Sequence, residues 1–327
     1  MKFTLQNFIL LSLLALLNSC GGGGSFDSSL TGGGSSGSGG TGSDPMPGTR
    51  IVSGGTMIKG SVVVNGVRFD DSGAEISIDG TPRTATDLQD GMVVQVEGRV
   101  GADNVATAGN ALRVDAQVQV RGAVTSVDLT TNPQSFVVLG QVVLVDDLTI
   151  YSGVTGFADV APDDLVEVHG LRDTLERVRA TRIEANPAQM GDSTFDQIRG
   201  LVTGGTGTNP ATFNLGAQAV NAAGAVITPV GATYENSTLI EVRCNVRPCV
   251  DVNDVFQASR LEVEREEDSE FQPESGERIE AEGYISGFDS ASDQNFFVSG
   301  VPVTTTGSTF YKGGIEADLG NDVIVEA

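Results

Sequence analysis

The sequence predicts an all-β protein made of tandem, small, five-stranded OB-like barrels, with small β-sandwiches as the alternative architecture. Two observations carry this prediction. A motif of Ala, any residue, Arg, an aliphatic residue and an acid recurs at 111–115, 180–184 and 258–262. Strand-like runs also end on glycines that are 74, 76 and 84 residues apart, namely Gly66, Gly140, Gly216 and Gly300. Repetition at a nearly constant period is typical of tandem modules.

The first element is an export signal over residues 1–19. Lys2 precedes a run of ten mostly apolar residues, Phe8–Leu17. As a helix this run would be about 15 Å long, whereas a bilayer core needs about 20 apolar residues. The segment therefore predicts a cleavable signal peptide rather than a membrane-spanning helix.

The end of this signal resembles the lipobox of bacterial lipoproteins, in the residues Leu17-Asn18-Ser19-Cys20. The resemblance implies that Cys20 becomes the first residue after cleavage and carries acyl chains, palmitate among them. An ordinary secretory signal with an incidental cysteine is the alternative. Gly21, rather than Asp, follows the cysteine, which in enteric bacteria implies the outer membrane. The expected location is the bacterial cell envelope, lipid-anchored on the periplasmic face or the surface of that membrane.

Residues 20–50 form the expected tether between the lipid and the folded body. They contain long Gly and Ser runs and few large apolar side chains. Such a linker is a flexible coil with a root-mean-square reach of about 30 Å. The folded part is therefore expected to stay near a membrane without lying on it.

Four barrel units are expected after the tether. Each offers about five short strands with turn signals such as Asn65-Gly66 between them, which suits a small closed barrel. The predicted units are residues 51–116, 117–190, 191–268 and 269–327.

The fourth unit is expected to be incomplete. Its last residues align Val325 and Glu326 with Val96 and Glu97, so that Ala327 stands where Gly98 does and the fifth strand is missing. A truncated chain is the favoured explanation, and a gap filled by another segment is the alternative.

Each repeated motif raises a question of strand geometry. Its Ala and its aliphatic residue are three positions apart, which predicts that they cannot share one face of a regular strand. The preceding strand ends on Gly98, on Gly170 or, in the third unit, on Cys244. A glycine inside a strand predicts a β-bulge or a sharp bend.

The runs "GSVVVNGVRFDDSGAEISIDG" and "DLQDGMVVQVEGRV", followed by "ALRVDA", resemble a repeat of bacterial lipoproteins that is known only as a domain of unknown function. Residues 54–116 carry this resemblance most fully, and the third unit departs from it at Cys244. The resemblance implies β-barrels and an envelope location. It implies no activity.

Cys244 and Cys249 remain once Cys20 is assigned to the lipid. An exported protein meets an oxidising compartment, where two nearby thiols tend to pair. The spacing of four intervening residues is not that of a C-x-x-C redox or zinc motif. We predict a structural disulfide, with a redox role as the alternative.

Composition argues against several activities. The net charge of −24 argues against a nucleic-acid partner, because such binding depends on Lys and Arg neutralising phosphates. His169 is the only histidine, and we predict a structural or surface role for it. The sequence contains no phosphate loop, dinucleotide fingerprint or H-E-x-x-H motif. No enzyme activity, metal or cofactor is predicted.

The predicted function is a non-enzymatic binding or structural module for an envelope protein or a saccharide. The alternative is a Ca²⁺-dependent adhesin or matrix component, with acidic candidates at 251–255, 261–283 and 289–295, none of which has EF-hand spacing. A hydrolase is the least favoured hypothesis, because it would require two carboxylates and His169 to meet in one cleft.

Overall fold

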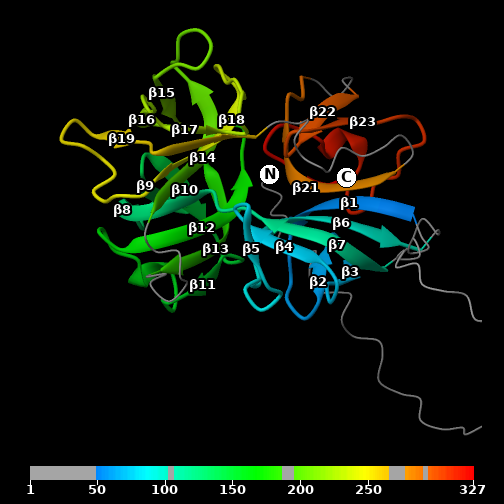
Figure 1. Cartoon of the computed structure of the whole chain (residues 1–327). Coiled ribbons are helices and arrows are strands. Elements are labelled where there is room, and N and C mark those ends of the chain that lie inside the picture. The colour runs from blue at the N-terminus through cyan, green and yellow to red at the C-terminus, as the bar shows by residue number, and fades with distance from the viewer. Residues whose placement is uncertain (1–48, 102–106, 186–194, 265–276, 290–293) are drawn as a thin grey trace, which may run out of the picture.

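The computed structural model describes residues 49–101, 107–185, 195–264, 277–289 and 294–327. Over these residues the protein consists of β-strands and two short 3-10 helices, which confirms the all-β prediction. Figure 1 shows two pairs of units side by side, with units 2 and 3 in green to yellow and units 1 and 4 in blue and in orange to red. The described residues include no helix that is both apolar and long enough to cross a membrane.

Unit 1 contains the strands β1 (Thr49–Thr56), β2 (Val62–Val64), β3 (Val67–Asp70), β4 (Glu75–Ile78), β5 (Thr81–Arg83), β6 (Val93–Val100) and β7 (Ala108–Ala116). Five of these close a ring in the order β1-β2-β3-β7-β6, in which only β3 and β7 are parallel. A bridge between Ile58 and Val63 joins β1 to β2. This order is the OB arrangement, as predicted. Asn65 and Gly66 form the β2–β3 turn with φ of 49° and 75°, values typical of a type I′ hairpin.

Unit 2 repeats this ring. It contains β8 (Val120–Asp128), β9 (Gln134–Val138), β10 (Gln141–Val145), β11 (Ile150–Ser152), the 3-10 helix η1 (Phe157–Asp159), β12 (Leu165–Arg172) and β13 (Val178–Ala185). The ring order is β8-β9-β10-β13-β12, with β10 and β13 parallel. Units 1 and 2 therefore share one topology.

Unit 3 has the same ring with a divided fifth strand. It contains β14 (Asp196–Thr203), β15 (Thr212–Leu215), β16 (Gln218–Asn221), β17 (Val226–Thr228), β18 (Leu239–Cys244), β19 (Val255–Gln257) and β20 (Arg260–Val263). β16 pairs in parallel with β19, and β18 pairs antiparallel with β20. The two consecutive strands β19 and β20 thus occupy the place of β7 and β13.

Unit 4 has the first four strand positions of the ring. It contains β21 (Arg278–Ser286), β22 (Asn295–Val298), β23 (Val301–Thr304), the 3-10 helix η2 (Glu316–Asp318) and β24 (Ile324–Glu326). β21 pairs with β22 and with β24, and β22 pairs with β23. Among the described residues no strand joins β23 to β24.

A β-bulge explains the spacing of the repeated motif. In unit 1 the register shifts between Glu97 and Gly98, which leaves one extra residue on β7. Ala111 and Val114 therefore both face the core, at 2% and 0% exposure, although they are three residues apart. The expectation that they cannot share a face is wrong for this reason. Gly98 is required here, because a Cβ would lie 2.6 Å from the carbonyl oxygen of Asn110.

The turn before β24 corrects the expected alignment of the last strand. The Asp322 amide donates to the carbonyl of Ile285, as the Asp163 amide donates to that of Val124 in unit 2. The two turns also share a positive φ, 65° at Asp322 and 73° at Asp163. β24 and β12 therefore start in the same register.

This register fixes the position of the final residues. Counting from the shared turn, Glu326 is equivalent to Glu167 of β12. Ala327 consequently stands two positions before the one of Gly98, where the sequence alignment alone had placed it. The repeat was detected correctly, but alternating aliphatic residues did not fix its register.

Hydrogen bonds between first strands join the units in pairs. β1 pairs in parallel with β21, which links units 1 and 4, and β8 pairs antiparallel with β14, which links units 2 and 3. The apolar core follows this division: units 2 and 3 share one cluster, and units 1 and 4 each have their own. Charged groups meet between the two pairs, where Asp79 of unit 1 contacts Arg121 of unit 2 and Arg243 of unit 3.

Candidate functional site

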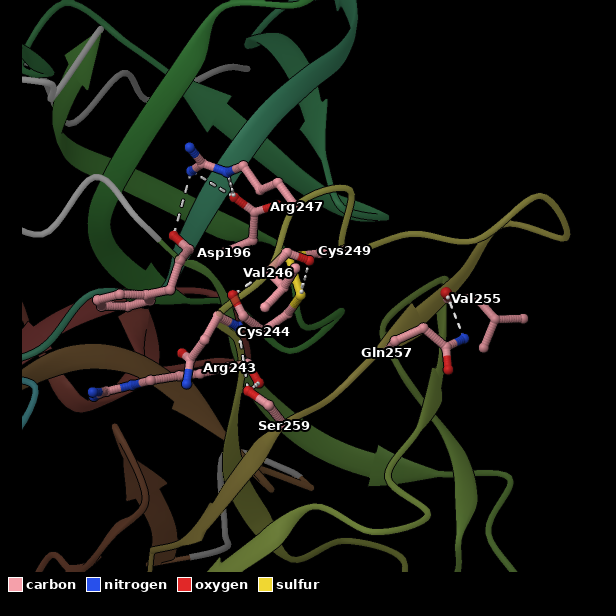
Figure 2. The surroundings of a disulfide bond; sticks show 11 residues. Asp196, Arg243, Cys244, Val246, Arg247, Cys249, Val255, Gln257 and Ser259 are labelled. Atoms are coloured by element: carbon pink, nitrogen blue, oxygen red, sulfur yellow. Dashed lines mark hydrogen bonds and ion pairs between the residues drawn. A yellow bond between two sulfur atoms is a disulfide. The ribbon is translucent and has the colours of Figure 1, made fainter.

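The predicted disulfide is present. Cys244 and Cys249 are bonded, with their Cα atoms 5.6 Å apart, and both side chains are buried. Figure 2 shows the bond between Cys244 and Cys249 near Val246, and the guanidinium of Arg247 on the carboxylate of Asp196. Closing so short a loop contributes about 2 kcal/mol of stability in the chain-entropy model. Cys20 lies outside the described residues.

Cys244 occupies the position that glycine has in units 1 and 2. In unit 3, where Cys244 replaces this glycine, the fifth strand is interrupted. Ala258 and Ser259 separate its two parts, β19 and β20. The Ser259 amide donates instead to the carbonyl of Arg243, and its hydroxyl accepts the Asn245 amide. The disulfide thus stabilises the place where the bulge of the other units is replaced.

His169 is fully buried, at 0% exposure. Its Nδ1 lies 2.9 Å from the carbonyl oxygen of Gln117, and its Nε2 lies 3.1 Å from Glu167 Oε1. Glu167 also accepts the guanidinium of Arg121, at 2.5 Å. The histidine is therefore part of a buried ionic cluster.

This cluster, which we call the ionic junction, is where units 1, 2 and 3 meet. Asp79 of unit 1 accepts the amide of Val118 and lies 3.9 Å from Arg121 of unit 2. Arg243 of unit 3 donates to the carbonyl oxygen of Asp79 at 2.9 Å. Both guanidinium groups also stack on the ring of Phe195, at 4.4 and 5.1 Å from its centroid.

The carboxylates of the ionic junction differ strongly in pKa. Burial would raise the pKa of Glu167, but the hydrogen bond to His169 and the charge of Arg121 outweigh it and lower that pKa to about 2. Burial, together with the charge of Asp79, raises the pKa of Glu241 to about 8 although Arg243 contacts it. Burial likewise raises the pKa of Asp79. One carboxyl is therefore held ionised and its neighbours are held toward the neutral form.

The ionic junction does not provide a catalytic arrangement. Arg121, Glu167 and His169 are each less than 5% exposed, so a substrate has no access to them. The condition set for a hydrolase, two carboxylates and His169 in an open cleft, is not met here. Strongly shifted pKa values also arise in structural ion-pair networks. We therefore assign the ionic junction a structural role, which is to hold units 1, 2 and 3 together.

The acidic segments considered for Ca²⁺ give no cluster among the described residues. Asp251 Oδ1 accepts the amides of Asn253 and Val255, and its Oδ2 accepts the Gln257 amide. Glu264 is ion-paired with Arg199. Residues 265–276 and 290–293, which belong to two of the acidic candidates, lie outside the described residues.

A cavity of about 610 Å³ lies where all four units come together. Its size is in the range of small-molecule sites. Backbone and side chains of β1, β6, β12, β14 and β21 form its wall. Among the lining side chains are Gln95, Gln117, Gln119, Leu171, Arg172, Glu176, Arg199, Leu239, Ile279, Glu282 and Tyr284.

The charged groups of this four-unit cavity are anchored by the protein. Arg172 donates to Gln119 at 3.1 Å and to the carbonyl oxygen of Glu176 at 2.7 Å, and burial lowers its pKa to about 10. Glu282 accepts the Thr56 amide at 2.7 Å. Burial raises the pKa of Glu176 and of Glu282. A guanidinium group from unit 2 and a carboxyl group from unit 4 that line the cavity are therefore each anchored by hydrogen bonds.

One polar atom of the cavity wall has no protein partner. Arg199 is 9% exposed, and its terminal nitrogens contact Gln117 and Glu264. Among the described residues, no group accepts a hydrogen bond from its Nε, which is itself buried. A buried donor left unsatisfied is costly.

A second pocket, of about 620 Å³, lies at one end of barrel 1. Its cations are already engaged, because Arg68 contacts Ser61 and the Lys59 ammonium donates to the carbonyl oxygen of Thr86. This pocket is formed by one unit alone. The four-unit cavity requires all four units to pack together, whereas this pocket requires unit 1 only.

The sequence contained a signal for the ionic junction that was not used. Arg121 and Glu167 alternate with core valines on β8 and β12, which places both on the outer face of barrel 2. Charged residues at such positions are either exposed to solvent or paired with charges of a neighbouring unit. Only the packing of neighbouring barrels distinguishes the two.

Parts of the chain are similar to a known family. The chain matches the family described as a domain of unknown function, DUF5666, over residues 121–184 and 282–327. These segments lie in units 2 and 4, whereas the resemblance argued from the sequence rested mainly on unit 1. No curated protein matches the chain. The similarity supports a repeated β-barrel domain.

Proposed function

We propose that the protein is a lipid-anchored, non-enzymatic binding module of the bacterial cell envelope, and that its ligand is a saccharide held in the four-unit cavity. The observation that carries this proposal is the cavity itself, whose wall is supplied by all four barrels. The ionic junction holds units 1, 2 and 3 to one another through buried charged groups.

The chemistry of the wall favours a saccharide over a simple ion. Sugar hydroxyls both donate and accept hydrogen bonds, and the wall offers amide, carboxyl and guanidinium groups together. Leu171, Leu239 and Ile279 provide apolar surface for the carbon faces of a sugar ring. Glu282 and Arg172 are of opposite charge, so the wall selects neither anions nor cations.

The test is isothermal titration calorimetry with three neutral probes: maltotetraose, cellotetraose and chitotetraose. We expect at least one of them to bind with a Kd between about 1 µM and 1 mM, a range of about −8 to −4 kcal/mol. Ile279→Trp should abolish this binding, because Ile279 lines the cavity and is 42% exposed, so a larger ring can fill the space.

Val230→Trp is the matched control, since Val230 is 98% exposed in unit 3 and does not line the cavity. It should leave binding unchanged. Heat from none of the three probes, or binding that survives Ile279→Trp, would contradict a saccharide site in the four-unit cavity.

The anchor is tested separately. When the chain is expressed in a bacterium fed labelled palmitate, we expect the label on the protein and the protein in the membrane fraction. Cys20→Ser should remove both, because Cys20 is the proposed acylation site. Cys249→Ser, which removes a different thiol, should keep the label. Palmitate on the Cys20→Ser variant would show that the lipobox assignment is wrong.

A further inference from the structure

The pocket at one end of barrel 1, which we call the barrel-1 pocket, contains two charges that the equivalent hairpins of the other units lack. Arg68 and Asp70 lie two residues apart on β3, and both are exposed side chains in the pocket wall. The equivalent residues of units 2, 3 and 4 are uncharged: Val142, Ala219 and Pro302 for Arg68, and Leu144, Asn221 and Thr304 for Asp70. Because those units form the same hairpin without these charges, the hairpin does not require them.

Arg68 and Asp70 do not neutralise each other, although the same face of β3 carries both. Arg68 donates from Nε to the Ser61 hydroxyl at 2.5 Å and from Nη2 to the carbonyl oxygen of Gly60 at 3.4 Å. Asp70 accepts the Ser72 amide at 3.0 Å, and this hydrogen bond lowers the pKa of its carboxyl. Within the described part of the chain, no ion pair joins the two side chains. Each charge is therefore held by neutral groups.

Lys59 and Asp71 add a second pair of opposite charges to the wall of the barrel-1 pocket. The Lys59 ammonium donates to the carbonyl oxygen of Thr86 at 3.2 Å, and no described carboxylate forms an ion pair with it. The Asp71 carboxylate accepts no hydrogen bond from the described residues. An ammonium has three N–H donors and a guanidinium has five, so Lys59 and Arg68 both keep donors for a ligand.

The floor of the barrel-1 pocket is apolar. Met57, Val62 and Leu88 line it, and each of these residues is 1% exposed. The volume of about 620 Å³ is within the range of small-molecule sites. A ligand with both charges beside an apolar group matches such a pocket, whereas an ion of a single sign would meet a like charge in the wall.

We propose that the barrel-1 pocket binds a free α-amino acid with an apolar side chain. The ligand carboxylate contacts the Arg68 guanidinium and the Lys59 ammonium, its ammonium contacts the carboxylates of Asp70 and Asp71, and its side chain packs on the apolar floor. Residues two apart on one strand face are separated by about 7 Å. The opposite charges of the ligand must therefore lie close together, as they do on the single Cα of an amino acid.

This site is separate from the proposed saccharide site. No residue lines both the barrel-1 pocket and the four-unit cavity. The barrel-1 pocket belongs to unit 1 alone, so its ligand would bind whether or not the four-unit cavity is occupied. The two proposals can therefore fail independently.

The experiment is isothermal titration calorimetry of the full chain with L-leucine, L-methionine and L-phenylalanine. We expect at least one of them to bind with a Kd between about 1 µM and 1 mM. The N-acetyl derivative of that amino acid keeps only the carboxylate, and its amide keeps only the ammonium. Each derivative should bind at least about tenfold more weakly, because it loses the hydrogen bonds of one charged group.

Two protein variants locate the binding. Arg68→Gln should weaken it at least about tenfold, as should Asp70→Asn combined with Asp71→Asn, because hydrogen bonds to charged groups are the strong ones. Arg113→Gln is the matched control, since Arg113 also lies on the surface of unit 1 but does not line the pocket. It should leave binding unchanged.

A thermal melt of each variant separates loss of the site from loss of the fold, and we expect all three to unfold close to the temperature of the parent protein. Heat from none of the three amino acids would overturn the proposal. So would an N-acetyl derivative that binds as tightly as its amino acid, which would indicate a plain anion site, or binding that survives Arg68→Gln.

Discussion

Replacing Arg121 with methionine is expected to lower the free energy of unfolding by about 3–5 kcal/mol at neutral pH. Arg121 is 4% exposed and is ion-paired with Glu167, whose side chain is 3% exposed. Methionine keeps much of the volume but leaves Glu167 and Asp79 without that positive charge. Removing one partner of a buried ion pair is strongly destabilising, because the remaining charge stays buried and uncompensated. Urea denaturation of the two proteins measures the difference.

Arg113→Met is the matched control for this substitution. Arg113 contacts Glu75 at 3.5 Å on the surface of unit 1, where the Glu75 side chain is 81% exposed. Exposed ion pairs contribute about 0–1 kcal/mol, so this variant should be nearly as stable as the parent. Equal effects of Arg121→Met and Arg113→Met would show that the ionic junction does not hold the units together.

A second substitution identifies the cause of the loss. If uncompensated charge is responsible, adding Glu167→Gln to Arg121→Met should recover part of the stability, because one buried carboxylate is then neutral. If lost packing is responsible, the two effects should simply add.

Repeat spacing and strand alternation were sufficient to predict the barrels. Gly98 and Gly170 recur before the Ala-x-Arg motif in units 1 and 2 because both fifth strands are paired through the same bulge, and at Gly170 a Cβ would lie 2.3 Å from the carbonyl oxygen of Arg179. Backbone requirements of this kind leave a mark at the same position in each copy that shares them. They are therefore visible in one sequence.

The contacts between barrels could not be predicted in the same way. Arg121 and Arg243 come from different units and meet only because Asp79 and Phe195 lie between them. Nothing in the period of the strands specifies how an outer face of one barrel meets another. His169 illustrates the consequence: a structural or surface role was predicted for it, and the structure places it against Glu167, which also accepts the guanidinium of Arg121 in the ionic junction.

The same buried carboxyls make stability depend on pH. Glu241 has an ordinary pKa of 4.5, which folding raises to about 8. Between these values the folded chain keeps a proton that the unfolded chain has lost, so stability falls as pH rises through this window. Glu167 has the opposite sign, because folding lowers its pKa from 4.5 to about 2 and its contribution is lost as pH falls through that window. Stability contributed by this pair is therefore greatest near pH 4.5.

Between pH 5 and pH 8 the free energy of unfolding is expected to fall by an amount on the order of 3 kcal/mol, since each pKa unit corresponds to about 1.4 kcal/mol. Glu241→Gln should remove most of this fall, because the amide imitates the protonated carboxyl. Gln197 Nε2 donates to Glu241 at 2.7 Å, and the Oε1 of Gln197 has no partner. If the Gln197 amide turns over, that oxygen can accept a hydrogen bond from residue 241.

Urea denaturation at pH 5, 6.5 and 8 measures the effect, with Glu235→Gln as the exposed control. Stability that rises between pH 5 and 8, or an equal fall in the Glu241→Gln variant, would show that Glu241 is ionised in the folded protein.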